Sequence, residues 1–202
     1  MNLSLSTLRR AAFGLCSVAA LVAMTGCAHP ISMSPDAKLA ASTAPKVNKA
    51  VAYVITPADM ALEVTTPGGG GDKVKYQPYR DLDASLYAAF SEVFTDVSKA
   101  ASVAEAQALA PKGVKLVIVP TIATTSSSDS AFTWPPTQFQ VTLNCTATDV
   151  AGQTVAQVKA VGNGAATFSE FKSDFSLSAR RASSEAIANL VKALAANPDL
   201  RR

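Results

Sequence analysis

The sequence predicts an α/β domain of the α+β type, a two-layer sandwich in which helices pack on one face of a mixed, mainly antiparallel sheet. Two segments, 81–97 and 176–196, repeat apolar residues at helical spacing, and the segments around them carry strand patterns. The resulting order is strand, helix, strand, strand, strand, helix. The chain has 202 residues, 49% of them hydrophobic and 16% charged, which suits one globular domain and excludes a disordered protein.

The first 26 residues have the plan of a secretory signal peptide. A short polar start contains Arg9 and Arg10, and an apolar stretch runs from Ala11 to Met24 before Cys27. The stretch is shorter than the ~20 residues that a permanent transmembrane helix needs. We therefore expect residues 1–26 to be cleaved.

The junction Met24-Thr25-Gly26-Cys27 resembles the lipobox of bacterial lipoproteins. The resemblance implies that Cys27 becomes the first mature residue and carries a covalent diacylglycerol and an N-acyl lipid. Two or more acyl chains make a stable membrane anchor. Ala28, a non-acidic residue after the cysteine, implies the periplasmic side of the outer membrane. The alternative is an ordinary signal peptide with a cysteine beside its cleavage site.

Residues 27–49 are expected to form the lipidated cysteine and a flexible tether, and residues 50–202 a single periplasmic domain. From Ala28 to Lys49 the chain is rich in Ala, Ser, Pro and Lys and shows no periodicity. His29, the one histidine of the chain, is expected to be solvated in this tether. Cleavage removes two arginines and no acidic residue, so the net charge falls from +3 to +1. This balance argues against a nucleic-acid partner.

The first strand of the domain is expected at 50–55, where an apolar run ends before Pro57. Four glycines at 68–71 then predict a flexible hairpin tip, with its arms at 62–64 and 74–76. The spacing around these glycines does not fit a phosphate-binding loop, which requires Gly-Lys followed by Ser or Thr.

The segment 81–97 is predicted to be a helix that begins at a capping Asp81 and buries one apolar face. Glu92 and Asp96 are four residues apart and are expected on its solvated face. A shorter helix is expected at 102–110.

The rest of the chain predicts an antiparallel sheet closed by a helix. In order, we expect a strand at 114–121, a Ser/Thr-rich linker at 124–130, strands at 138–145 and 154–161 joined by a turn, an irregular connection at 162–175 and a helix at 176–196. Apolar and polar residues alternate along 138–145, so one face of that strand is buried. Cys145 lies on the apolar side and is expected to be a core residue.

Few residues of this chain suit catalysis or metal binding. The one histidine lies in the expected tether and the three cysteines form no close pair, so a catalytic triad and a zinc site are not expected. We expect no cofactor and no enzymatic activity. One enzymatic alternative stays open, an envelope-polymer hydrolase that uses a carboxylate pair drawn from Asp81, Glu92, Glu170 and Asp174.

Aromatic side chains in predicted loops are the candidate partner-binding residues. They are Tyr76, Tyr79, Phe132 and Trp134. Aromatic side chains on loops offer a large contact area at a small cost in conformational entropy. The alternative is that they cover the edge of the core.

Several segments together resemble the YajG family of outer-membrane lipoproteins. They are Gly26-Cys27-Ala28-His29-Pro30, Ser34-Pro35, Arg80-Asp81-Leu82, the alternating hairpin, Ala188-Asn189-Leu190 and Asn197-Pro198-Asp199-Leu200. The order of elements is also similar to that of envelope assembly lipoproteins with a CsgG- or LptE-like arrangement.

The resemblance implies a lipid-anchored, non-enzymatic binding or scaffolding domain that acts in envelope biogenesis or maintenance. We expect a monomer that binds an envelope protein, whose identity the sequence does not reveal. A subunit of an oligomeric secretion or assembly complex is the alternative.

Overall fold

A computed structural model describes residues 28–36, 42–66, 73–128 and 137–202. Its elements are β1 (Ala28–Pro30), β2 (Val47–Val54), α2 (Pro57–Ala61), β3 (Val64–Thr66), β4 (Lys73–Tyr76), α3 (Pro78–Val93), β5 (Phe94–Ala100), α4 (Val103–Gln107), the 3-10 helix η2 (Ala110–Lys112), β6 (Val114–Ser127), β7 (Gln138–Asp149), β8 (Thr154–Ala165), α5 (Phe168–Ser173) and α6 (Leu177–Ala196). The predicted class is confirmed, because helices pack against mixed sheets.

The main sheet has the strand order β5-β2-β6-β7-β8. β2 pairs in parallel with β5 and β6, whereas β6, β7 and β8 pair antiparallel. The antiparallel ladders are the longest, since Leu116–Ser127 pairs with Gln138–Asp149. A small second sheet has the order β1-β4-β3. Its β3–β4 pair, in which Thr66 pairs with Val74, contains the predicted arm at 74–76, whereas the other arm lies at Val64–Thr66 and not at 62–64. The predicted tip at 68–71 lies outside the described residues.

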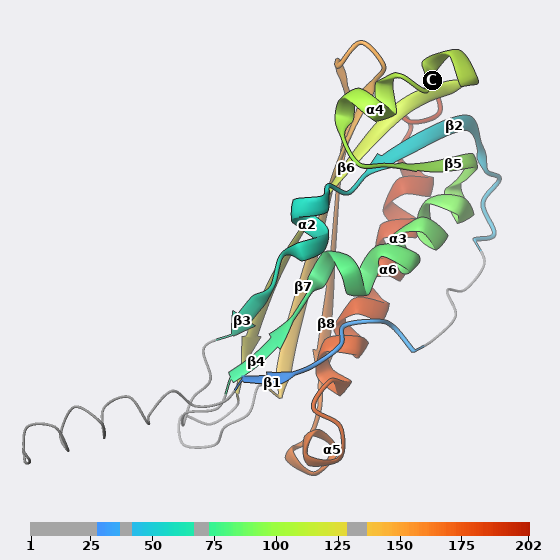
Figure 1. Cartoon of the computed structure of the whole chain (residues 1–202). Coiled ribbons are helices and arrows are strands. Elements are labelled where there is room, and N and C mark those ends of the chain that lie inside the picture. The colour runs from blue at the N-terminus through green and yellow to red at the C-terminus, as the bar shows by residue number, and fades with distance from the viewer. Residues whose placement is uncertain (1–27, 37–41, 67–72, 129–136) are drawn as a thin grey trace, which may run out of the picture.

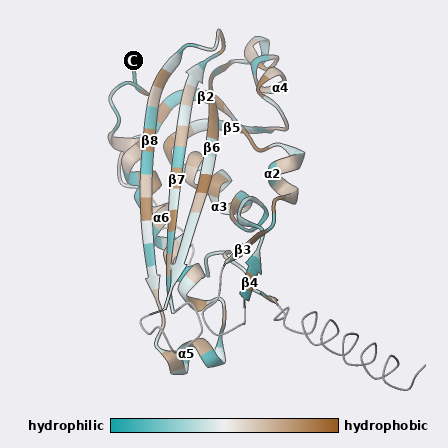
Figure 2. Cartoon of the chain, turned by 90° about the vertical axis from the view of Figure 1, so that its left-hand side faces the viewer, coloured by the Kyte–Doolittle hydropathy of each residue, from teal (hydrophilic) through white to brown (hydrophobic). Residues whose placement is uncertain are grey.

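The main core lies between the five-stranded sheet and the two long helices, α3 and α6 (Figure 1). Polar and apolar bands alternate along β6, β7 and β8 (Figure 2), as expected for strands with one buried face. A smaller cluster on the opposite face, which includes Val54, Ala106 and Val117, is covered by α4. The long helices therefore share one face, and the short α4 covers the other at one end of the sheet.

Helix α6 approaches β8 very closely at two glycines. A Cβ on Gly162 would lie 2.1 Å from the carbonyl oxygen of Ala182, and one on Gly164 would lie 2.0 Å from that of Ser178. Only glycine leaves room for the helix backbone at these positions. The close approach explains why small residues, including Ala182 and Ala186, form the buried face of α6 over its N-terminal half.

The predicted helix 81–97 is wrong at both ends. α3 starts at Pro78, and Asp81 lies in its first turn while Gln77 is the N-cap. The helix stops at Val93, and the residues after it form β5, which pairs with the edge of β2. The helical pattern of apolar residues continues past Val93, but hydrogen bonding of these residues to the edge of β2 favours a strand there. Asp96 lies on this strand, so it does not share a helix face with Glu92.

β5 also has a polar link to α3. The Lys99 ammonium lies 2.5 Å from Oδ2 of Asp83, and the hydroxyl of Tyr53 on β2 donates to Oδ1 of the same carboxylate at 3.0 Å. Burial and the neighbouring carboxylate raise the pKa of Tyr53. These contacts tie α3 to the two parallel strands beside it.

Other boundaries differ because backbone pairing extends past the apolar pattern. β6 includes residues 124–127 of the predicted linker, and β8 continues through 162–165 of the predicted connection. Two short helices were not predicted, α2 and α5. Each starts with a capping box, Thr56 with Asp59 and Thr167 with Glu170, and this four-residue pattern is a signal that could have revealed them.

Candidate functional site

The N-terminal segment 28–36 lies on the domain. β1 pairs in parallel with β4, and the amide of Ile31 donates to the carbonyl of Lys75 at 2.9 Å. The side chain of Met33 is 0% exposed and belongs to the main core. The expectation of a flexible tether over 27–49 is therefore wrong for residues 28–36, and it is also wrong for 47–49, which begin β2.

Polar contacts hold this segment between α3 and α6. The amide of Ser32 donates to Oγ of Ser176 at 3.1 Å, and the amide of Met33 donates to Oδ2 of Asp81 at 2.8 Å. The Ser34 hydroxyl donates to the backbone carbonyl of Asp81 at 3.0 Å. Burial raises the pKa of Asp81, and the Met33 amide partly offsets that effect by stabilising the charged carboxylate.

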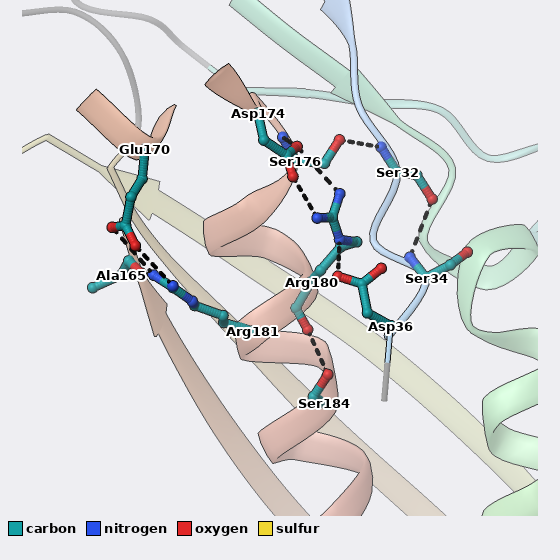
Figure 3. Close-up of polar contacts among 10 residues, drawn as sticks. All are labelled: Ser32, Ser34, Asp36, Ala165, Glu170, Asp174, Ser176, Arg180, Arg181 and Ser184. Carbon is teal, nitrogen blue, oxygen red and sulfur yellow. Dashed lines mark hydrogen bonds and ion pairs between the residues drawn. The ribbon is translucent and has the colours of Figure 1, made fainter. Parts of the chain in front are cut away.

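Arg180 on α6 joins three parts of this end of the molecule (Figure 3). Its Nε donates to Oδ2 of Asp36 at 2.6 Å, and its two Nη atoms contact the carboxylate of Asp174, which lies between α5 and α6. The guanidinium lowers the pKa of Asp174. A planar guanidinium suits such a fork of carboxylates better than a lysine would.

The neighbouring Arg181 fixes α5 in the same way (Figure 3). Its Nη2 lies 2.9 Å from Oε1 of Glu170, and its Nη1 donates to the carbonyl of Ala165 at 2.6 Å. Glu170 also accepts from the amide of Thr167 at 2.8 Å. The Arg181 guanidinium is the main reason why the pKa of Glu170 falls to about 2.

Aromatic side chains surround α5. The ring of Phe175 stacks on His29 of β1 with centroids 5.3 Å apart, and it meets the ring of Phe171 in a T-shaped arrangement with centroids 4.9 Å apart. The ammonium of Lys172 lies 5.5 Å from the ring centroid of Phe168. His29 is thus packed on the domain, contrary to the expectation of a solvated tether residue.

This end of the molecule also carries two open depressions. One, of about 310 Å³, lies between β1, β4 and α3, and the other, of about 290 Å³, lies at the ends of β6, β7 and β8. The docked segment and α5 lie at one end of the molecule, opposite α4 (Figure 1). The residues that line both depressions belong to strands and helices that reach the same end. We define the docked-segment end as residues 28–36 together with 168–181.

The aromatic candidates divide into two groups. Phe132 and Trp134 lie outside the described residues, as does Cys27. Tyr76 and Tyr79 are buried, and burial raises the pKa of both phenols. These two tyrosines therefore pack in the core, which was the alternative to partner binding, and they do not offer a free contact surface.

Both tyrosines have internal hydrogen-bond partners. The hydroxyl of Tyr76 lies 2.7 Å from Oγ1 of Thr124, and the hydroxyl of Tyr79 accepts from the amide of Ile122 at 3.2 Å. Ile122 lies on the part of β6 that extends beyond its pairing with β2. Tyr79 therefore satisfies a backbone group that the sheet leaves unpaired on that side.

The four carboxylates weighed for a hydrolase each have a structural partner. Asp81 binds Met33, Glu92 accepts from the amide of Ser42 at 3.1 Å, and Glu170 and Asp174 bind arginines. A general acid needs a raised pKa, whereas the arginines lower the pKa of Glu170 and Asp174. Within the described ranges, no three His, Cys, Asp or Glu side chains gather as metal ligands do.

Cys145 is buried, and desolvation raises the pKa of its thiol to about 12. The expected core position of this residue is confirmed. A thiol with such a pKa is almost entirely protonated near neutral pH, which makes it a weak nucleophile.

Sequence reasoning missed the two arginines and the aromatic side chains around α5. Phe168, Phe171 and Phe175 are spaced three and four residues apart, a helical spacing inside a segment that the sequence analysis treated as irregular. Asp36, one carboxylate partner of Arg180, is 144 residues away in sequence. Asp174 and Glu170 precede their arginines by 6 and 11 residues, across the junction between α5 and α6, so no pattern within one helix indicates these pairs. Among the described residues no helix combines the length and apolarity needed to cross a bilayer.

Comparison with known proteins indicates similarity of fold. No protein-family model and no curated protein matches the sequence. The structure is similar to the crystal structure of protein XCC0632 from Xanthomonas campestris, of family DUF330, with a TM-score of 0.50 and 12% identity over 83% of this chain and 93% of that chain. At this identity the similarity concerns the fold, and a fold does not determine a function.

Proposed function

We propose that this protein is a lipid-anchored lipoprotein of the outer membrane, whose periplasmic domain binds or scaffolds other envelope components without catalysing a reaction. This is the kind of protein that the YajG resemblance implies. The observation that carries the proposal is the junction at Cys27. A signal-like segment and a lipobox-like sequence end there, and the next residue, Ala28, already belongs to β1.

This arrangement supports an anchor for a physical reason. Acylation needs Cys27 to be accessible, whereas Cys145, the other cysteine outside residues 1–26, is buried in the core. The two cysteines thus provide a site of modification and a matched internal control.

The anchor can be tested by growing cells that produce the full chain with labelled palmitate. We expect label in the wild type and in Cys145→Ala, and none in Cys27→Ala. Label retained in Cys27→Ala would overturn the anchor. Separation of the two membranes on a density gradient then tests the location, since the wild type should sediment with the outer membrane.

Binding is best tested at Trp134, a candidate residue in a predicted loop. A photoreactive amino acid at position 134 should give a discrete crosslinked species in intact cells. The same amino acid at the buried position 76 is the control and should give none. If the photoreactive amino acid gives no crosslinked species at position 134 or at other exposed positions, the binding role is contradicted.

A further inference from the structure

The anchor point and the folded domain are separated by a single peptide bond. Ala28 is held in β1, where it pairs with Lys73, and the next amide links it to Cys27. Consecutive Cα atoms are ~3.8 Å apart. Acyl chains on Cys27 would therefore start within a few ångströms of the docked-segment end, and the domain would have no long tether on which to move away.

Two large apolar side chains at this end face solvent. Phe168 at the start of α5 is 54% exposed, and Phe175 is 39% exposed. They are the exposed phenylalanines of the described chain, because Phe90, Phe94, Phe139 and Phe171 are buried. Phe175 stacks on His29, two residues from Cys27, so this apolar surface adjoins the anchor point.

The charges at the same end are compensated. Asp36 and Asp174 share Arg180, and Glu170 binds Arg181, so the carboxylates are held by cations. Lys172, whose ammonium lies over the face of Phe168, adds an exposed cation. A phenylalanine ring that enters the acyl region beside a lysine that stays at the headgroups is a combination found on surfaces that bind the membrane interface.

We propose that the docked-segment end rests on the bilayer that holds the anchor, with Phe168 and Phe175 in its interfacial region. The occupant of this apolar surface is thus the lipid headgroup layer, and α4 at the opposite end points away from the membrane (Figure 1). This inference rests on the proposed lipid anchor. A second copy of the chain on the same surface is the competing occupant, and the test separates the two.

The test places a fluorescent probe at the contact. The lipidated full chain, with Trp134→Phe to remove its one tryptophan, receives Phe168→Trp in one variant and Tyr87→Trp in a matched control. Tyr87 is 49% exposed on α3, packs against Tyr53 of β2 and does not belong to the docked-segment end. Both proteins are reconstituted into phosphatidylethanolamine and phosphatidylglycerol vesicles that contain dibrominated phosphatidylcholine, which quenches indole fluorescence on contact.

We expect the emission of Phe168→Trp to shift to the blue and to be quenched by the brominated lipid, and that of Tyr87→Trp to be unaffected. Emission of Phe168→Trp that shifts to the blue without quenching would indicate a protein partner, such as a second copy, and would overturn the proposal. Emission that neither shifts nor is quenched would overturn it as well.

Flotation of the same vesicles distinguishes this failure from failure of the anchor. If the protein floats with the vesicles but its fluorescence is not quenched, the lipid anchor is supported and the proposed membrane contact is contradicted. If the protein does not float and carries no acyl mass on Cys27, both the lipid anchor and the membrane contact are contradicted.

Discussion

Arg180 and Asp36 are separated by 144 residues in sequence, and the Nε of the arginine lies 2.6 Å from Oδ2 of the aspartate. The same guanidinium holds Asp174, so one side chain of α6 connects the N-terminal segment with the α5–α6 junction. The long helix α6 packs along β8 and β7. Because Arg180 lies on this rigid helix, its contact with Asp36 fixes the position of residues 28–36 on the domain.

The first prediction concerns the docking of residues 28–36. Arg180→Ala removes the contacts to Asp36 and Asp174, and because these groups are partly exposed we expect a loss of about 0.5–1 kcal/mol in the local stability of the segment. Amide hydrogen exchange should accelerate severalfold at Ser32 and Met33. Arg181→Ala is the matched control and should accelerate exchange in α5 instead. Equal exchange at Met33 in wild type and Arg180→Ala would contradict the role of this arginine.

The second prediction concerns the contact between α6 and β8. In Gly162→Ala the new Cβ would lie 2.1 Å from a backbone oxygen of α6, so the helix must shift. We expect a loss of about 2–3 kcal/mol in the free energy of unfolding, measured in urea. Asn163→Ala, at an exposed position of the same strand, should cost well under half as much. If Gly162→Ala unfolds at the same urea concentration as the wild type, α6 and β8 are farther apart than the structure places them.

The third prediction separates the core role of Tyr79 from partner binding. Tyr79→Phe keeps the ring and leaves the amide of Ile122 without its acceptor, so we expect a loss of about 1–2 kcal/mol in the free energy of unfolding. Tyr87→Phe, which alters an exposed hydroxyl, should change stability little. Unchanged stability for Tyr79→Phe would argue against the internal hydrogen bond.

The fourth prediction concerns acid. The folded-state pKa of Glu170 is about 2, below the ordinary value of 4.5, so ionised Glu170 contributes stability above pH 4.5 and loses that contribution as the pH falls toward 2. The wild type should therefore exceed Glu170→Gln in free energy of unfolding at pH 7, and the difference should shrink between about pH 4.5 and 2. A difference that is constant over this range would contradict the Arg181–Glu170 pair.

The strand and helix patterns of the C-terminal half could be read from the sequence because they repeat locally. Alternation along 138–145 predicts one buried face, and the structure places Phe139, Val141 and Leu143 in the core. The last residues of the predicted helix at 81–97 show the limit of this reasoning. Phe94 and Val97 suit a helix and a strand equally well, and pairing with β2 decides between the two.

The candidate site was less predictable than the fold. The proposed junction at Cys27 can be predicted from the sequence, because signal-like and lipobox-like patterns are linear segments. The docking of residues 28–36 is not, since this segment is rich in small residues without periodicity and gains its order from contacts with Asp81, Ser176 and Arg180.

The sequence by itself determined the class of fold, the core position of Cys145 and the expectation of an anchor, because hydrophobic periodicity and signal patterns are local properties of the chain. Tertiary structure alone decided that residues 28–36 are docked, that Tyr76 and Tyr79 lie inside, and that Phe175 packs against both His29 of β1 and Phe171 of α5. These outcomes depend on backbone pairing and ion pairs between residues far apart in sequence, and such contacts form only when the sheet and α6 are in place.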